Sequence, residues 1–480
     1  MPLKVYNNLT QHKEEFNPVS PPEVKMYVCG VTVYDDCHIG HARAAVVFDL
    51  IYRVLLSKGY QVTFVRNFTD IDDKIIQRSR ELKIPWHQVA ATYIDAFRRD
   101  MGRLNLKTPT QEPKATEHIP EMIQLIQKLV EKGIAYEAEG DVFYSVSRFK
   151  GYGKLSHKKI EELEAGARVE VMEKKKNPLD FALWKKSKPG EPSWESPWGP
   201  GRPGWHIECS AMSLKFLGES LDIHGGGRDL IFPHHENEIA QSEGATGKPF
   251  VRYWLHNGFV NIHEEKMSKS TGHFRKLRDV LEHYSSEAVR YFLLSAHYRS
   301  PIDYSEQNMR EAEEALDRFY ATIDRFKKFS EGHLGGDEKE FHLLPKFEKA
   351  MDDDFNATQF LGDLFDWVRR LNKSLDKLEK QKKQVSSAFK KSVLSEIAQV
   401  SAVLGVLDKE PAQYLAAKKG RHISQSGLDA SFVEKLIEDR KKARSAKNFA
   451  EADRIRQELE QKGIILKDNP DSSTEWHVKQ

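Results

Sequence analysis

The segment MYVCGVTVYDDCHIGHAR, residues 26–43, concentrates side chains that could do chemistry. It holds two of the chain's three cysteines, Cys29 and Cys37, and the two histidines of an HIGH tetrapeptide, His38 and His41. Thiols and imidazoles at this density are compatible with a metal site, a nucleophile or a phosphate site. The choice among these depends on the elements that position the side chains.

The HIGH tetrapeptide is predicted to lie where a strand feeds a helix. Residues 24–34, rich in Val and Tyr, indicate a buried strand that ends in a turn. Apolar residues then recur at helical spacing from Ala42 to Gly59, and a second strand follows at 62–65. This order predicts an α/β fold with a doubly wound, Rossmann-type parallel sheet, in which ligands bind at the first strand-to-helix junction. A phosphate suits that helix N-terminus, and Gly40 would let a flat base approach closely.

A second cationic motif, KMSKS, occupies residues 266–270. Small, turn-favouring residues separate Lys266 from Lys269, which predicts a loop able to neutralise a polyphosphate. A KxxK loop alone is usually solvated surface charge. HIGH followed by KMSKS in one chain, however, resembles the signature of class I aminoacyl-tRNA synthetases, which activate an amino acid with ATP and pass it to tRNA.

A third set of residues has the spacing of metal ligands. Cys209 lies in GRPGWHIECSAM, and His234 and Glu238 lie four residues apart in DIHGGGRDLIFPHHENEIAQSE. On a helix, this spacing places an imidazole and a carboxylate on one face, as a zinc site requires. Since HxxxE is also common on solvated helices, and His235 or Glu236 could serve instead, the residues alone leave the metal and its ligands open.

Together, the motifs resemble the cysteinyl-tRNA synthetase family over almost the whole chain. The resemblance rests on MYVCGVTVYDDCHIGHAR, GWHIECSAM, HGGGRDLIFPHHENEIAQSE, WLHNGFV, KMSKS and MDDDFNA. It implies that one zinc ion in the amino-acid pocket is held by Cys29, Cys209, His234 and Glu238. Cys37, His235 and Glu236 are passed over in the family pattern.

The resemblance also implies a reaction and its residues. L-Cysteine and ATP, with Mg²⁺, would form cysteinyl-adenylate and pyrophosphate, and the 3′-terminal adenosine of tRNA(Cys) would then accept the cysteine. The implied catalytic residues are His38, His41, Lys266 and Lys269. Gly40 and Lys269 are implied to contact ATP. The residues implied around the amino acid are Gly30, Thr69, Trp205 and His224.

A zinc ion would give this pocket a means to separate cysteine from serine. A coordinated thiol loses its proton, and the soft thiolate suits zinc better than a neutral hydroxyl does. A plain pocket separates such near-isosteres by only ~1 to 3 kcal/mol. Metal ligation would therefore make an editing domain unnecessary.

The pattern along the chain predicts several domains. Helical periodicity runs almost continuously from 305 to 405, and the polar stretch 409–430 predicts a link to a last small module. The predicted regions are a catalytic domain at 1–115 and 200–304, a connective insertion at 116–199, a helical bundle for tRNA binding at 305–408, and a small C-terminal anticodon-recognition domain at 409–480.

Bulk composition excludes several classes of protein. With 39% hydrophobic and 30% charged residues and a mean hydropathy of -0.62, the chain reads as globular rather than disordered or fibrous. No apolar run reaches the ~18 to 20 residues of a membrane span, and no signal peptide is recognisable. Three cysteines without a CxxC spacing argue against a disulfide framework. We therefore expect a cytoplasmic monomer without a membrane partner.

Two alternative functions compete with that of a tRNA ligase. A related ligase would join cysteine to a small amine through the same adenylate, but such an enzyme has little use for the C-terminal third of this chain. That third includes basic residues on a predicted helix that could meet phosphates: Arg440, Lys441, Lys442, Arg444 and Lys447. A catalytically inactive RNA-binding paralogue would be expected to lack a motif histidine, a motif lysine or a zinc ligand, and all are present. The tRNA ligase is therefore favoured.

Overall fold

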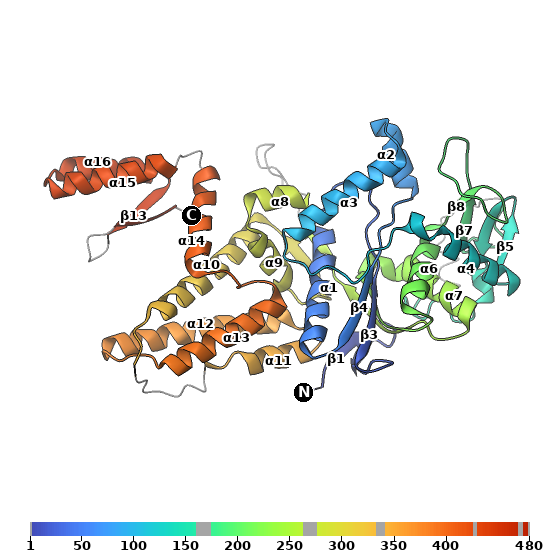
Figure 1. The fold of residues 1–480 in the computed structure, drawn as a ribbon, viewed down its shortest axis with the longest axis horizontal. Helices are drawn as coiled ribbons and strands as arrows, with labels where there is room; N and C mark the ends of the chain where they lie inside the picture. Colours follow the sequence, from blue (N-terminus) through green and yellow to red (C-terminus); the bar gives the residue numbers. More distant parts are fainter. Residues whose placement is uncertain are drawn as a thin grey trace. The chain divides into compact units, whose positions relative to one another are not determined.

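The computed structural model describes residues 2–159, 174–262, 276–332, 341–425, 430–468 and 474–478 (Figure 1). The chain forms two compact units. The first consists of Met1–Ala312, Asp337–Trp367 and Ser392–Val406. The second consists of Glu313–Gly336, Val368–Lys391 and Leu407–Gln480.

A four-stranded parallel sheet in the order β10-β9-β3-β4 forms the centre of the first unit. Its strands are β3 (Glu23–Val28), β4 (Gln61–Arg66), β9 (Leu221–Gly227) and β10 (Val251–Asn257). Helix α1 (Ile39–Ser57) connects β3 to β4 and lies alongside them (Figure 1). Its apolar residues are buried, and the chain turns at Gly59 with φ +85°. The predicted Rossmann-type strand–helix–strand unit is confirmed.

The first strand is shorter than predicted. We expected a strand over 24–34, but β3 ends at Val28. The Cys29 N–H still donates to the Gly225 carbonyl, whereas the Gly30 N–H donates to the side chain of Asn67 at 2.9 Å. Because the backbone leaves the sheet at this point, the residues between β3 and α1 are free to form a binding turn.

The remaining elements of the first unit surround this sheet. A hairpin precedes it, formed by β1 (Lys4–Asn7) and β2 (His12–Glu15). An antiparallel sheet in the order β5-β6-β7-β8 is inserted between β4 and β9. Its strands are β5 (Ala135–Ala138), β6 (Asp141–Tyr144), β7 (Phe181–Lys186) and β8 (Gly201–Pro203). The other elements up to β12 are α2 (Asp73–Leu82), α3 (Trp86–Gly102), α4 (Ile119–Glu131), α6 (Trp205–Leu217), α7 (Glu236–Thr246), β11 (Val260–Ile262), α8 (Leu277–His283), α9 (Ser286–Ser295) and β12 (Ile302–Tyr304).

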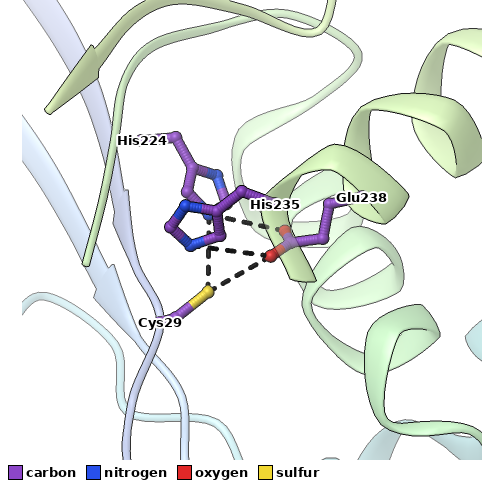
Figure 2. A group of neighbouring side chains, drawn as sticks. All are labelled: Cys29, His224, His235 and Glu238. Carbon is purple, nitrogen blue, oxygen red and sulfur yellow. Dashed lines mark hydrogen bonds and ion pairs between the residues drawn. The ribbon is translucent and has the colours of Figure 1, made fainter. Parts of the chain in front are cut away.

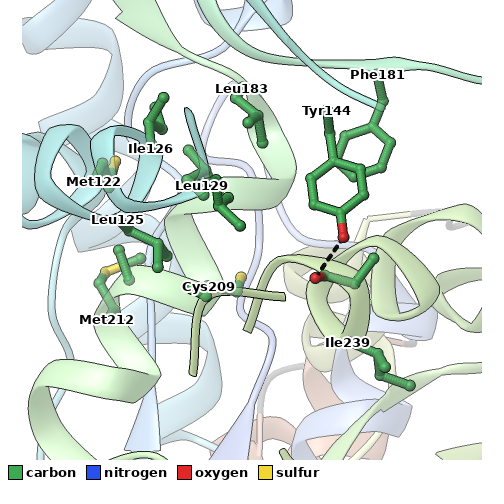
Figure 3. Packing of buried hydrophobic residues seen from close by; sticks show 14 of the residues in the cluster. Met122, Leu125, Ile126, Leu129, Tyr144, Phe181, Leu183, Cys209, Met212 and Ile239 are labelled. Atoms are coloured by element: carbon green, nitrogen blue, oxygen red, sulfur yellow. Dashed lines mark hydrogen bonds between the residues drawn. The ribbon is translucent and has the colours of Figure 1, made fainter. Parts of the chain in front are cut away.

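One hydrophobic core joins the inserted sheet to helices α4, α6 and α7 (Figure 3). Leu125 of α4 and Cys209 of α6 belong to it, and Tyr144 of β6 stacks on Phe181 of β7 with ring centroids 4.8 Å apart. The Tyr144 hydroxyl donates to the Ala240 carbonyl of α7 at 2.8 Å. The insertion therefore supports the two helices that carry Cys209 and Glu238, two of the four predicted metal ligands.

Helices dominate the rest of the chain. They are α10 (Glu306–Lys328), α11 (Leu344–Asp352), α12 (Ala357–Lys380), α13 (Ser387–Leu404), α14 (Pro411–Gln425), α15 (Ala430–Ser445) and α16 (Phe449–Gln461), followed by a hairpin of β13 (Ile464–Asp468) and β14 (Thr474–Val478). The helical periodicity between 305 and 405 is thus confirmed. None of the helices in the described ranges is long and apolar enough to cross a membrane.

The prediction of a polar link at 409–430 was wrong, because α14 occupies most of it. Within the second unit, Tyr414 of α14 is buried and stacks on Tyr320 of α10, with ring centroids 4.1 Å apart. Its hydroxyl donates to Asp317 at 3.0 Å. A single aromatic anchor therefore gives a buried face to a segment that composition alone describes as polar.

Candidate active site

A cavity of about 690 Å³ opens where the parallel strands end. The last residue of each strand of the central sheet lines it: Val28, Arg66, Gly227 and Asn257. Six of the predicted site residues also line it: Cys29, Gly30, His38, Gly40, His41 and Trp205. This is the edge of an open α/β sheet at which ligands are expected.

The two histidines of the HIGH turn cap helix α1. His38 is the N-cap residue, and its Nδ1 accepts the Gly40 N–H at 3.1 Å. The His38 N–H in turn donates to His41 Nδ1 at 3.3 Å, which completes a reciprocal capping box. The rings stack with centroids 3.7 Å apart. A Cβ on Gly40 would lie 2.9 Å from His38 Nδ1, so glycine leaves room for the capping ring.

This capping fixes how the histidines can act on a ligand. Burial, together with smaller effects of nearby His38 and Lys74, lowers the pKa of His41 to about 3. Burial also lowers the pKa of His38, opposed by Asp229. Both rings are therefore neutral near pH 7, and since each Nδ1 accepts a hydrogen bond, each proton resides on Nε2. The cavity is offered two N–H donors rather than two cations.

Four predicted ligands meet beside this turn. The donor atoms of Cys29, Cys209, His234 and Glu238 all lie within 4.8 Å of one another. Cys29 Sγ is 3.5 Å from Cys209 Sγ, 3.5 Å from His234 Nε2 and 3.3 Å from Glu238 Oε1. Two sulfurs, an imidazole and a carboxylate make a donor set that suits zinc. The structure thus brings together four residues that lie far apart in the sequence.

A second group of potential ligands shares two of these side chains (Figure 2). It combines Cys29 and Glu238 with His224 and His235. His224 Nε2 lies 3.5 Å from Cys29 Sγ and 3.4 Å from Glu238 Oε2, and His235 Nε2 lies 3.9 Å from Glu238 Oε1. Geometry alone therefore permits either group to hold a metal. His235, which the family pattern does not use as a ligand, lies as part of the second group.

Two other residues that the motif chemistry left open lie in neither group. Cys37 is buried, and its carbonyl accepts the Leu277 N–H at 2.7 Å. Glu236 is also buried, and its Oε2 accepts the N–H groups of Leu155 and Ser156 at 3.1 and 2.8 Å. Neither side chain belongs to a group of potential metal ligands among the described residues.

Two histidines around the cluster were not predicted. His206 Nδ1 lies 2.9 Å from His234 Nδ1, which leaves His234 Nε2 facing Cys29 and Glu238. His256 Nε2 lies 2.8 Å from His235 Nδ1. Such partners orient metal-binding imidazoles. The one signal for them in the sequence is that both lie in motifs that carry the resemblance, GWHIECSAM and WLHNGFV.

Neighbouring groups hold two of the four donors, Glu238 and Cys209, in their ionised form. Burial raises the pKa of the Glu238 carboxyl, but the charges of His224 and His234 outweigh burial and hold it well below its usual range. Burial likewise raises the pKa of the Cys209 thiol, but hydrogen bonds from Cys29 and His234 bring it down to about 6. Burial raises the pKa of Cys29 well above its usual value. One thiolate and one carboxylate are thus present to receive a cation.

Three other predicted residues have distinct positions. A Cβ on Gly30 would lie 1.5 Å from the Asn67 carbonyl oxygen, so only glycine fits there. The Thr69 hydroxyl donates to Glu208 Oε2 at 2.9 Å. Thr69 and His224 are buried and do not line the cavity themselves, but they contact lining residues, Thr69 through the Val31 carbonyl and His224 through Cys29 Sγ. These two positions place Thr69 and His224 behind the cavity wall.

Lys266 and Lys269 of KMSKS lie outside the described residues. The described chain resumes at Lys276, which forms a β-bridge with His38. Asp36 Oδ2 lies 2.9 Å from Lys276 Nζ and 3.0 Å from Arg278 Nη2. The chain that follows the KMSKS segment is therefore attached to the HIGH turn.

Three family models match the chain. One described as the class I (C) tRNA synthetase catalytic domain matches residues 15–314. A DALR domain model matches residues 346–408, and a cysteinyl-tRNA ligase anticodon-binding domain model matches residues 428–476.

Similar proteins cover the whole length of the chain. A cysteine–tRNA ligase of Geobacter sp. (strain M21) is 57% identical, and one of Syntrophobacter fumaroxidans is 55% identical, each with all of both chains covered. One of Thermodesulfovibrio yellowstonii is 52% identical over 99% of this chain and 100% of its own. Among solved structures, a Mycobacterium tuberculosis methionyl-tRNA synthetase in complex with methionyl-adenylate matches with a TM-score of 0.62 and 17% identity, covering 82% of this chain and 93% of that chain. That likeness concerns the fold.

Proposed function

The chain belongs to the cysteinyl-tRNA synthetase family, and we propose that it ligates L-cysteine to tRNA(Cys). A carboxylate oxygen of cysteine attacks the α-phosphorus of ATP, which releases pyrophosphate and forms cysteinyl-adenylate. A ribose hydroxyl of the 3′-terminal adenosine of tRNA(Cys) then attacks the acyl carbon and AMP leaves. The observation that carries the proposal is the meeting of Cys29, Cys209, His234 and Glu238 beside a cavity that the HIGH turn also lines.

These four residues fit zinc better than a structural ion-pair network. Glu238 Oε2 is buried without a hydrogen bond, and the two thiols face an imidazole and a carboxylate rather than a lysine or arginine among the described residues. Such a set of donors, with His206 orienting His234, is one that would hold zinc. Bound zinc would hold the substrate thiol as a thiolate, an interaction that the neutral hydroxyl of serine does not match.

The chain's own residues would orient cysteine against this group. Of the four donors, only Cys29 lines the cavity, so the substrate thiol would arrive over Cys29. Trp205 stacks on His234 with ring centroids 4.2 Å apart and also lines the cavity, which makes it the natural wall of the thiol pocket. We assign Gly30, Thr69 and His224 to the surroundings of the amino acid. Gly30 lines the cavity, whereas Thr69 and His224 would support the residues that line it.

ATP, with Mg²⁺, would bind at the HIGH turn. The Nε2–H groups of His38 and His41 would donate to its phosphate oxygens, and Gly40 would contact the nucleotide at the first turn of α1. Lys266 and Lys269 would neutralise the charge that develops on the departing pyrophosphate.

The domain assignments form part of the proposal. Residues 1–115 and 200–304 would carry out the chemistry, with 116–199 as the connective insertion. Residues 305–408 would bind tRNA and 409–480 would recognise the anticodon, in agreement with the position of the anticodon-binding family model. We further propose that the enzyme acts as a cytoplasmic monomer.

Cysteine-dependent exchange of pyrophosphate into ATP tests the first step, and charging of tRNA tests the second. We expect exchange with cysteine and none above background with serine, and one zinc per chain by elemental analysis. Cys209→Ser should lose zinc and exchange together, whereas Cys37→Ser, a matched control outside both donor groups, should retain both.

Three results would contradict the proposal. They are equal exchange with serine, zinc retained by Cys209→Ser, and exchange without charging of tRNA. The last would favour the ligase that joins cysteine to a small amine.

A further inference from the structure

We propose that Lys74 is a further catalytic residue, whose ammonium group binds a phosphate of ATP. The inference rests on the proposed function, since it names a residue for the same reaction. Lys74 belongs to neither the HIGH nor the KMSKS motif and lies in the sequence NFTDIDDKII, after the second strand of the sheet.

Lys74 lies on the wall of the cavity that the HIGH turn lines. It is in the first turn of α2 and lines the same cavity as His38 and His41. Its Nζ lies 5.2 Å from the ring centroid of Tyr34, another residue of the cavity wall. It is also close enough for its charge to lower the pKa of His41, although less than burial and His38 do.

A cation in the described part of this cavity would favour the binding of an ATP phosphate. The HIGH histidines are neutral near pH 7, so they can donate hydrogen bonds to a phosphate but bring no positive charge. Arg66 also lines the cavity, but its Nη2 lies 2.6 Å from Glu112 Oε1. Lys74 has no carboxylate within 4 Å of its ammonium group among the described residues, and its side chain is exposed to the cavity solvent. It is therefore the available positive charge on this part of the wall.

Ion pairing within the fold does not explain a lysine at this position. A cation in the first turn of a helix opposes the helix dipole. The neighbouring acidic residues are engaged elsewhere: Asp72 caps the helix by accepting the Lys74 backbone N–H at 2.9 Å, and Asp73 pairs with Lys185 and Arg202. Within the described residues, the ammonium group of Lys74 thus contacts the Tyr34 ring but pairs with no carboxylate, and an anionic ligand in the cavity would supply that counter-charge.

In the reaction, Lys74 would act by charge alone. The Pα–O bond to the cysteine carboxylate forms as the bond to pyrophosphate breaks, and negative charge shifts onto the leaving pyrophosphate. A fixed ammonium group stabilises that charge without exchanging a proton. Arginine at this position would preserve the charge, whereas glutamine would preserve length and polarity without it.

The test compares Lys74→Gln with Lys74→Arg and with Lys83→Gln in the full chain with zinc bound. Lys83 lies at the other end of α2, is exposed and does not line the cavity, so its substitution removes the same charge from the same helix. For Lys74→Gln, we expect kcat/KM for ATP in pyrophosphate exchange to fall by about 10- to 100-fold, the range for loss of a charge-assisted hydrogen bond. KM for cysteine and the thermal midpoint should change little, Lys74→Arg should recover most of the activity, and Lys83→Gln should resemble the wild type.

Each other outcome overturns the inference. Exchange by Lys74→Gln at the wild-type level, or an equal loss in Lys83→Gln, would exclude a specific contact with ATP. Normal exchange with a loss confined to transfer would place Lys74 against tRNA instead. The wild-type protein separates this failure from failure of the proposed function: if it shows cysteine-dependent exchange and charges tRNA, the proposed function stands whatever Lys74 does.

Discussion

His38 uses one ring nitrogen for the fold and leaves the other for a ligand. Its Nδ1 caps α1, while the Nε2–H remains a donor beside the cavity. This division predicts that stability and catalysis can be separated. His38→Ala should lower the free energy of unfolding by about 1 kcal/mol through loss of the cap and should also impair pyrophosphate exchange. His38→Asn should restore stability, because asparagine is a good N-cap residue, but should not restore exchange.

Urea denaturation and pyrophosphate exchange on the same preparations make this measurement. The control is the wild-type protein, with and without ATP, because bound ligand would also raise apparent stability. If His38→Asn recovered exchange as well as stability, the cap alone would explain the motif histidine, and the proposed contact between Nε2 and phosphate would be wrong.

The grouping of the predicted metal ligands followed from the sequence resemblance, but the contacts around them did not. Cys29, Cys209, His234 and Glu238 were predicted as one group through a family resemblance, and the fold brings them together. Residue types alone did not separate His234 from its neighbour, and the structure shows why, since His235 also approaches Glu238. The partners of these residues depend on how α6, α7 and β10 pack, which no local pattern specifies.

At the scale of elements, buried charges connect α1 to helices distant in the sequence. Asp49 of α1 accepts a hydrogen bond from Arg53 at 2.7 Å and another from Arg290 of α9. Arg290 is fully buried, and its Nε donates to the Leu404 carbonyl at the end of α13. Two arginines and one carboxylate thus join three elements of the first unit.

Arg290→Met should therefore destabilise the protein strongly. Removing one member of a buried pair costs about 3 to 5 kcal/mol, because the remaining charge stays buried. Since Asp49 would keep Arg53, we expect a loss near the lower end of this range, measured by urea denaturation. The double variant Asp49→Asn/Arg290→Met should lose less than the sum of the single variants. Additive losses would show that Arg290 stabilises the fold through its carbonyl contacts rather than through Asp49.

The elements themselves were predicted where one local period dominates. The β3–α1–β4 unit and the helices from α10 to α13 follow from periods of two and 3.6 residues. The inserted antiparallel sheet pairs strands as distant as β6 and β7, so its register depends on packing against α4, α6 and α7. Helix α14 was missed because its buried face rests on Tyr414, whereas nearly half of its residues are polar.

At the scale of the whole molecule, the end of the chain has a core of its own. Val433, Ile455, Leu459, Ile464, Leu466 and Trp476 form a hydrophobic cluster that α15, α16, β13 and β14 provide. The basic residues predicted to meet phosphates on α15 are only partly available. Arg440 and Arg444 lie 2.8 and 2.6 Å from Asp468, which leaves Lys441, Lys442 and Lys447 as exposed cations on or shortly after this helix.

Removal of residues 428–480 should separate the two half-reactions. All described residues of the candidate active site belong to the first unit, and the deleted segment takes its own hydrophobic cluster with it. We therefore expect pyrophosphate exchange to remain within about twofold of the wild type, while kcat/KM for charging tRNA(Cys) falls by about 100-fold or more. A matched variant of the full chain is Lys441→Gln/Lys447→Gln. It should weaken the charging of tRNA(Cys) moderately. It should also make charging less dependent on salt, because the variant would make fewer contacts with tRNA phosphates. A parallel loss of exchange in the deletion would show that the C-terminal segment supports the catalytic unit, and undiminished charging would remove it from tRNA recognition.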